Sequence, residues 1–216
     1  MLIAIAYKVP NFEISGGPGW ADSAGFDIEA KAADSKIGLE DLRPLLQSLL
    51  EDRFQLKVHR ETKEASIYAL QVAKNGPKLP DAKEGGCTEM KPDQPLPPPP
   101  PPGQYPPTPC GGFFMGPNHL VGGKISMTQF VNALTNITGR PVVDKTGFTG
   151  TFDVSIDFSP EGTALMRGIP GPPPQLDNSG PSLFTVLQDQ LGLRLESEKG
   201  PEQIIVIDHA EKPSEN

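Results

Sequence analysis

Three histidines are the most obvious candidates for chemistry in this chain. His119 stands at the start of an expected strand, His209 follows Asp208 at the end of the last expected strand, and His59 lies within another. Asp208 cannot orient His209 as a general base, because adjacent strand residues point to opposite faces. His119 and His209 are therefore candidate catalytic residues, with ordinary strand residues as the alternative. His59 is expected to be a solvated or half-buried strand residue.

Carboxylates offer a possible metal site. Asp157 ends an expected strand, and Glu161 follows it in a loop. Oxygen ligands from two carboxylates and loop carbonyls suit calcium, so Asp157 and Glu161 are candidate ligands of a loose calcium site. The alternative is a solvated strand end, and no cofactor is required by the sequence.

Asp144 raises a separate question, because it lies in the segment VVDKTGFTG (Val142–Gly150). The tetrapeptide Asp-Lys-Thr-Gly surrounds the phosphorylated aspartate of P-type ion pumps, but such a pump also needs membrane helices and nucleotide-binding motifs, and the sequence shows neither. Gly147 and Gly150 favour a turn in which Asp144 binds nearby backbone amides. Asp144 stays a candidate nucleophile, with a structural turn as the favoured interpretation.

Trp20 is the one tryptophan of the chain and lies in the glycine-rich stretch GGPGWADSAG. An aromatic ring held in such a loop either stacks on a ligand or closes the edge of a small core. Trp20 is therefore the candidate ligand-binding residue.

The two cysteines flank a proline-rich insert. Eleven of the 26 prolines lie between Cys87 and Cys110, and such a segment favours an exposed polyproline II conformation. A disulfide across its base would stabilise the fold by about 3 kcal/mol in the chain-entropy model. A Cys87–Cys110 disulfide would place the protein outside the cytoplasm, whereas the alternative is two free thiols in a cytosolic protein.

Composition excludes several classes of protein. The 216 residues carry 27 acidic and 19 basic side chains, a net charge of −8, and no basic stripe with interleaved aromatics, which argues against nucleic-acid binding. No apolar run approaches the roughly 20 residues of a membrane-spanning helix. The start of the chain lacks the basic region of a signal peptide. If Cys87 and Cys110 are bonded, we therefore expect a periplasmic or secreted protein whose signal peptide has been removed.

Hydrophobic patterns on the two sides of the insert resemble each other. AGFDIEAKA (24–32) matches GTFDVSIDF (150–158) as a strand of alternating residues, and an amphipathic helix follows each, at 39–50 and at 181–191. Ser182 is a suitable N-cap for the second helix. Two strands with a polar hairpin between them then follow in each half, within 53–74 and within 192–210. A further helix precedes each half, at 2–9 and at 127–138.

These patterns predict an α+β fold made of two tandem copies of a helix-strand-strand-helix-strand-strand unit, with helices packed on mixed sheets. Residues 1–80 would form the first copy, 81–117 the proline-rich loop closed by the disulfide, and 118–216 the second copy. The second copy carries a proline- and glycine-rich insertion at 159–181. It also opens with a strand, HLVGGKI, that the first copy lacks, so we expect an N-terminal strand to be missing from the chain.

Several of these segments carry a family resemblance. AYKVPNFEISGGPGW, LLEDRFQLKVHRETKE, GRPVVDKTGFTGTFD and VIDHAEKPSEN together resemble the Solibacter-type paralogous family, a domain of unknown function expanded in soil acidobacteria. The resemblance covers nearly the whole chain and implies a signal peptide and an extracytoplasmic location, but no activity. At the level of fold, the second copy is also similar to the short N-terminal domains of secretins and TonB-dependent receptors, which bind other proteins.

The sequence lacks the common catalytic signatures, among them GxSxG, SxxK, HExxH, CxxC, the Walker loop and the EF-hand. We therefore expect an extracytoplasmic binding or protein-interaction module rather than an enzyme, with an envelope protein or a small molecule as its partner. The alternative is a hydrolase of small esters or lactones, in which calcium polarises the carbonyl and a carboxylate or histidine activates water.

Overall fold

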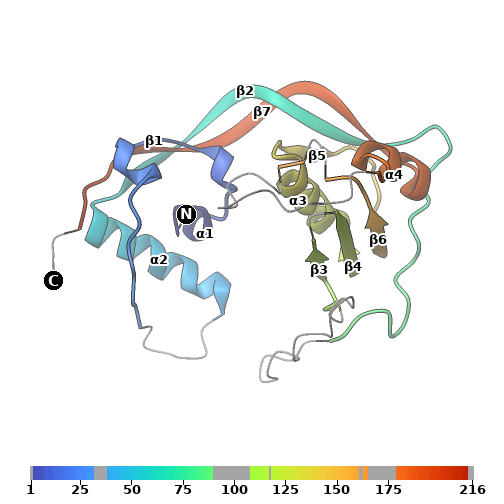
Figure 1. Ribbon diagram of the computed structural model, residues 1–216, viewed down its shortest axis with the longest axis horizontal. Helices are drawn as coiled ribbons and strands as arrows, with labels where there is room; N and C mark the ends of the chain where they lie inside the picture. The colour runs from blue at the N-terminus through green and yellow to red at the C-terminus, as the bar shows by residue number, and fades with distance from the viewer. Residues whose placement is uncertain are drawn as a thin grey trace. The chain divides into compact units, whose positions relative to one another are not determined.

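A computed structural model describes residues 2–31, 38–89, 108–116, 118–160, 163–164 and 179–213. The fold is α+β, as expected, with four α-helices and two sheets among these residues (Figure 1). The chain divides into two compact units: unit 1 comprises residues 1–65 and 201–216, and unit 2 comprises residues 66–200. The elements in chain order are α1 (Leu2–Tyr7), η1 (Asn11–Glu13), β1 (Ile14–Gly16), η2 (Gly19–Asp22), α2 (Leu39–Phe54), β2 (Lys57–Val72), β3 (Gly112–Met115), β4 (His119–Ser126), α3 (Met127–Thr138), β5 (Val142–Asp144), β6 (Thr151–Asp157), α4 (Leu183–Leu191) and β7 (Leu193–His209).

The long strands β2 and β7 contribute to both units. Each was expected to be a pair of short strands joined by a hairpin, and this expectation was wrong: β2 and β7 are single strands of 16 and 17 residues. They are neighbours in a four-stranded sheet of order β1-β7-β2-β5. His59 contacts Asp208, whereas Ala73 donates to the carbonyl of Gly192, so the two strands run antiparallel (Figure 1). The polar residues that were expected to form hairpins thus lie within β2 and β7, two neighbouring strands of one sheet.

This continuity changes the expected division of the chain. The last part of β7 joins the first 65 residues in unit 1, so the units do not follow one another along the chain. The structure consequently does not confirm two tandem copies. The segment expected as the first copy's long strand also has no strand pairing over the described residues 24–31. Its alternating apolar side chains, Phe26 and Ile28, are 40% and 44% exposed. The alternation of apolar residues here therefore does not correspond to the buried face of a sheet.

Helix ends in unit 2 follow local sequence signals. Ser126 accepts a hydrogen bond from the backbone of Gln129, whose side chain accepts one from the backbone N–H of Ser126, and this capping box starts α3. Ser182 caps α4 by accepting from the backbone N–H of Thr185, as predicted. Gly192 ends α4 in the left-handed conformation that glycine adopts without strain.

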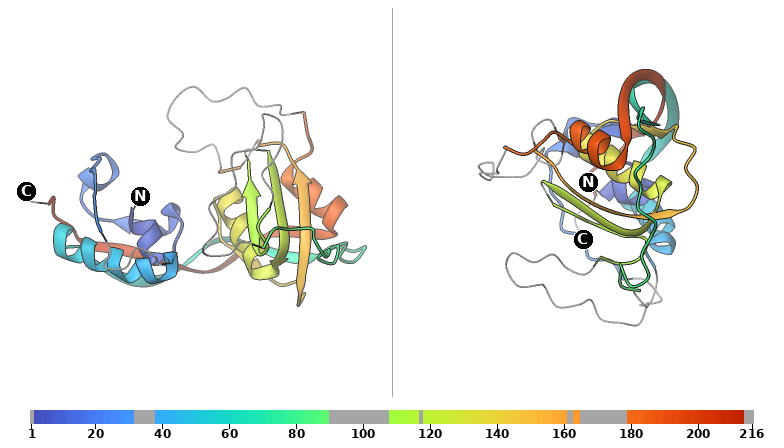
Figure 2. Two further views of the ribbon diagram at one scale, coloured as in Figure 1. Left: turned by 90° about the horizontal axis from the view of Figure 1, so that it is seen from below. Right: turned by 90° about the vertical axis from the view of Figure 1, so that its right-hand side faces the viewer.

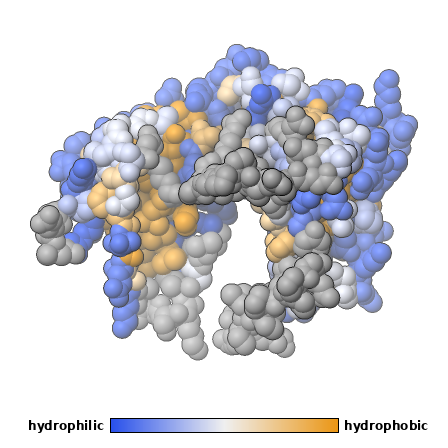
Figure 3. All heavy atoms as spheres, viewed as in Figure 1, coloured by the Kyte–Doolittle hydropathy of each residue, from blue (hydrophilic) through white to orange (hydrophobic). Residues whose placement is uncertain are grey.

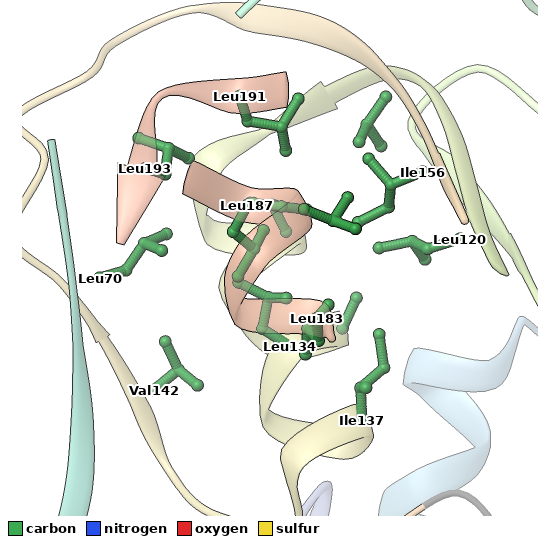
Figure 4. Packing of buried hydrophobic residues seen from close by; sticks show 14 of the residues in the cluster. Leu70, Leu120, Leu134, Ile137, Val142, Ile156, Leu183, Leu187, Leu191 and Leu193 are labelled. Carbon is green, nitrogen blue, oxygen red and sulfur yellow. The ribbon is translucent and has the colours of Figure 1, made fainter. Parts of the chain in front are cut away.

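The core of unit 2 lies between α3, α4 and strands of both sheets. The three-stranded sheet, of order β3-β4-β6, is antiparallel, and α3 contacts β4 while α4 contacts β6 (Figure 2). Aliphatic side chains from both helices and from strands of the two sheets meet in one cluster, which Figure 4 shows from close by. The labelled members are Leu70, Leu120, Leu134, Ile137, Val142, Ile156, Leu183, Leu187, Leu191 and Leu193.

Unit 1 has a smaller core beneath its own part of the four-stranded sheet. The helices α1 and α2 contact each other (Figure 2). Leu46, Leu50 and Phe54 follow one another at helical spacing on one stripe of α2. These side chains pack with Ile3 of α1 and Ile207 of β7. Strand β1 runs parallel to β7 and completes the edge of the sheet.

Candidate functional site

Asp144 lies in a hydrogen-bonded turn. Its carboxylate oxygen Oδ1 accepts from the backbone N–H of Thr146 at 2.8 Å and from the Thr146 hydroxyl at 2.7 Å. The hydroxyl of Thr146 in turn accepts from the backbone N–H of Phe148 at 3.1 Å. The turn expected from this motif is therefore present, and the Asp144 carboxylate helps to hold it together.

His119 is buried in the three-stranded sheet, with 5% of its surface exposed. Its ring stacks on Phe114 at a centroid distance of 5.3 Å, and it pairs in register with Asp157 on β6. Burial lowers the pKa of His119, against the opposing effect of the Asp157 charge, so the neutral imidazole is favoured. A buried ring in a strand is the arrangement of a structural histidine.

His209 and His59 lie at exposed positions in unit 1, each beside a carboxylate. His209 Nε2 lies 3.0 Å from Glu211, and Asp208 contacts His59 Nδ1 at 2.8 Å. Asp208 therefore orients the histidine across the ladder and not its neighbour in sequence. This pair could not be found from the sequence, because the register of β2 against β7 is needed to find it.

The structure describes one of the two candidate metal ligands. Asp157 is exposed at the end of β6, and Glu161 lies outside the described residues. Among the residues that the structure describes, no group of three His, Cys, Asp or Glu side chains could hold a metal ion.

Cys87 and Cys110 lie at disulfide distance, with their sulfur atoms 2.04 Å apart. The backbone of Thr88 donates to the carbonyl of Thr108, and that of Cys110 donates to the carbonyl of Thr88, so the two ends of the insert are also joined by hydrogen bonds. Within the described part of the chain, no helix is long and apolar enough to cross a membrane.

Trp20 belongs to a cluster of three aromatic rings in unit 1. Its ring stacks on Phe54, at a centroid distance of 6.5 Å and an interplanar angle of 25°. Phe26 meets both rings edge-on, at 5.9 Å from Trp20 and 5.3 Å from Phe54. Edge-to-face and stacked pairs of this kind are favourable geometries for aromatic side chains, so the three rings support one another.

The aromatic cluster forms part of a pocket of about 450 Å³ in unit 1, which we call the aromatic pocket. Apolar side chains gather on the visible face of this unit, shown in orange in Figure 3. The pocket is lined by Leu2, Ile3, Asn11, Trp20, Ala21, Ala24, Phe26, Ile28, Leu50, Phe54, Leu56, Ile207 and Ala210. These residues come from both helices, β7, the η1–η2 region and the extended segment that follows it.

A tight turn after β1 brings Trp20 to the pocket. Gly16 and Gly17 have φ values of 77° and 83°, which side chains rarely adopt. A Cβ at Gly16 would lie 2.8 Å from the carbonyl oxygen of Ile207, so the chain can pass this close to β7 only with glycine there. The short helix η2 then follows and carries Trp20.

The lining of the aromatic pocket determines what it can bind. Twelve of its thirteen lining residues are apolar, and the thirteenth, Asn11, is uncharged. Phe54 is 9% exposed, whereas Phe26 and Ile28 are 40% and 44% exposed. A pocket whose described side chains are mostly apolar and all uncharged favours a neutral, apolar ligand, because a charged ligand would lose its hydration without gaining an oppositely charged partner.

A second pocket, of about 490 Å³, lies in unit 2 and is more polar. It includes Lys78, Lys83 and Asp153, but Asp153 already accepts from the backbone N–H groups of Lys83 at 2.9 Å and Lys124 at 2.8 Å. Lys78 donates to the carbonyl of Asp189 at 2.9 Å. Since the Asp153 carboxylate and the Lys78 ammonium already bind backbone groups, we regard the aromatic pocket as the candidate functional site.

An α+β protein with an apolar pocket is thus the class that the fold and this geometry define. The chain belongs to the family described as "Protein of unknown function (DUF3738)", whose model matches residues 1–210. No match was found among curated proteins or among solved structures. Family membership agrees with the expectation of a domain of unknown function and indicates no catalytic class.

The sequence indicated one of the three aromatic residues of the site. Trp20 stood out as a single tryptophan in a glycine-rich loop, but Phe26 and Phe54 were expected to lie in strands. Phe54 is instead the last residue of α2, and Phe26 lies in an extended segment without strand pairing. The signal that could have found Phe54 is the spacing Leu46, Leu50, Phe54, which continues the helical stripe by one turn.

Proposed function

We propose that this protein is an extracytoplasmic binding protein that takes a small, neutral, apolar molecule in the aromatic pocket. One observation carries the proposal: a pocket of about 450 Å³ whose described lining residues all have apolar side chains except for Asn11. Pockets of a few hundred Å³ with apolar walls and few polar groups are typical of small-molecule sites.

Energetics support a ligand of this class. Water in contact with apolar walls is displaced favourably, at about 25 cal/mol for each Å² of apolar surface removed from water. The rings of Trp20, Phe26 and Phe54 also offer faces and edges to an alkyl chain or another ring. Among the described lining side chains, the Asn11 amide and the indole N–H of Trp20 can bond to a hydroxyl or carbonyl of the ligand.

An extracytoplasmic location rests on the cysteine pair. Cys87 and Cys110 lie at disulfide distance, and structural disulfides persist in oxidising compartments. The acidic net charge of −8 is compatible with a soluble partner and disfavours nucleic acid.

The test is calorimetric titration with dodecanol, a neutral apolar probe, and with dodecanoate as its charged counterpart. We expect dodecanol to bind with a roughly micromolar Kd and dodecanoate to bind more weakly. Phe26→Asp should weaken dodecanol binding by at least about tenfold, because it removes an aromatic wall and adds a charge. Phe12→Asp is the matched control, since Phe12 is also 40% exposed in unit 1 but does not line the pocket.

Two results would contradict the proposal. Dodecanol could fail to bind, or Phe26→Asp could bind it as well as the unchanged chain does. A parallel assay with chromogenic esters, run with calcium and with chelator, distinguishes the binding protein from the alternative, a calcium-dependent hydrolase. Turnover that the chelator abolishes and that both phenylalanine variants retain would favour the hydrolase.

A further inference from the structure

Strand β2 has an outer edge in unit 1 that no strand of the described residues covers. One edge of β2 pairs with β7. The other, outer edge pairs with β5, at Tyr68, Ala69 and Leu70. Over residues 57–65, no described strand pairs with the outer edge of β2. An edge of this kind presents backbone donors and acceptors that can pair with another chain.

The backbone groups that face outward can be identified from β5. Tyr68 donates its N–H to the carbonyl of Pro141, and the carbonyl of Leu70 accepts from Lys145, each at 2.8 Å. Since backbone direction alternates along a strand, the N–H and C=O groups of Arg60, Thr62 and Glu64 point to the same outer side. This places the open donors and acceptors in the middle of the exposed stretch.

The side chains along this edge form a self-complementary charge pattern. The sequence around Thr62 is Arg60-Glu61-Thr62-Lys63-Glu64, and all five residues are exposed. In an antiparallel pair of two identical strands centred on Thr62, Glu61 stands opposite Lys63 of the second copy, and Arg60 stands opposite Glu64. Because of the two-fold symmetry, each of these opposite-charge pairs occurs twice.

We propose that the outer edge of β2 pairs with the same edge of a second copy of this chain, antiparallel and centred on Thr62. This register is distinguished from its neighbours. A shift of the centre by one residue places Glu61 opposite Glu61, or Lys63 opposite Lys63, and like charges directly opposite each other are destabilising. The charges therefore select one alignment, and a chain without this symmetry fits the edge less well.

Edge strands often carry charged residues that prevent pairing, which is the competing explanation of this pattern. A protective edge repels every copy, whereas the order of signs here is attractive in one register. The paired stretch is short, so its interface falls in the class of small, weak contacts, and we expect a dimer that forms only at high protein concentration.

The test exchanges charges at Glu61 and Lys63, whose side chains lie on the strand face opposite to Val58 and the core of unit 1. Sedimentation velocity over a series of concentrations measures the dimer Kd for the unchanged chain, Glu61→Lys and Lys63→Glu. Each single change places like charges opposite each other twice, so each should raise the Kd at least about tenfold. A mixture of the two variants restores both opposite-charge pairs and should form a heterodimer with nearly the original Kd.

Glu84→Lys is the matched control, because it makes the same charge change at an exposed position of unit 2. It should leave the Kd unchanged. The proposal is overturned if the unchanged chain is monomeric at every concentration, which would mean that the charges protect the edge. It is also overturned if the single variants dimerise as well as the unchanged chain, or if their mixture fails to form a heterodimer.

Discussion

Glu13 is the residue whose ionisation depends most clearly on the fold. It is half-buried at the end of η1, and Glu202 of β7 is 8% exposed. Burial, and then the charge of Glu202, raise the pKa of Glu13 from 4.5 to about 7. A carboxyl whose pKa is raised in the folded state binds its proton more tightly there than in the unfolded chain.

This shift predicts the direction of the pH dependence. The stability from protonated Glu13 is fully present below about pH 4.5 and is lost as the pH rises through about 7. Urea unfolding should show unit 1 to be more stable at about pH 5 than at about pH 8. The difference should be only about 1 kcal/mol, because solvent screens the charge of a half-buried side chain. Glu13→Gln should reduce this difference, and an equal difference in that variant would contradict the assignment.

Residue types alone located part of the candidate site. Trp20 could be identified because it is the only tryptophan in the sequence and lies in a glycine-rich stretch. The rest of the pocket could not be predicted, because its lining comes from segments as distant in sequence as Leu2 and Ala210. The His59–Asp208 contact was missed for the same reason, since it depends on strand register and not on proximity in sequence.

At the scale of elements, the end of α4 gives a test of local packing. Gly192 has a φ of 63°, its carbonyl accepts from Ala73, and the carbonyl of Leu191 accepts from Lys78. A Cβ at Gly192 would overlap the carbonyl oxygen of Gly76. The loop after β2 is therefore packed directly against the end of the helix.

Gly192→Ala should accordingly destabilise the protein by about 3 kcal/mol or more, through left-handed strain and displacement of the loop backbone. Gly147→Ala is the matched control, because Gly147 has a φ of 68° but no atom within 4 Å of its added Cβ. It should cost only the strain, about 1 kcal/mol. Urea unfolding measures both, and equal losses would show that the packing at Gly192 does not matter.

Helices were predicted more successfully than strands. The expected helices at 127–138 and 181–191 are present as α3 and α4, because apolar periodicity and caps at Ser126 and Ser182 agree there. The middle parts of β2 and β7 were expected to be hairpins, because they are polar and exposed on both faces. Such residues give no alternation, and they lie in strands because β2 and β7 are neighbours in the sheet.

At the scale of the whole molecule, the disulfide predicts a measurable contribution to stability. Cys87 and Cys110 are separated by 23 residues, for which the chain-entropy model gives about 3 kcal/mol. Reductant should lower the free energy of unfolding of unit 2 by about this amount and should not affect the double variant Cys87→Ala/Cys110→Ala. Alkylation of both cysteines without reductant would contradict the bond and the proposed extracytoplasmic location.

Composition and pattern predicted the α+β class, and the family model supports a domain of unknown function over residues 1–210. The division of the chain into two units could not be predicted from the sequence. Residues 201–216 fold with residues 1–65, and β2 and β7 contribute to both units. No local pattern distinguishes one long strand shared by two units from two short strands in one unit.

Energy transfer from the Trp20 ring tests whether an apolar molecule binds beside it. Trp20 is the only tryptophan, so transfer to the neutral probe N-phenylnaphthylamine reports binding near this ring. We predict strong sensitised emission from the probe with the unchanged chain and with Phe12→Asp, and its loss with Phe26→Asp. Probe that binds, as shown by direct excitation, but receives no energy from Trp20 would contradict binding beside Trp20 and place the site elsewhere.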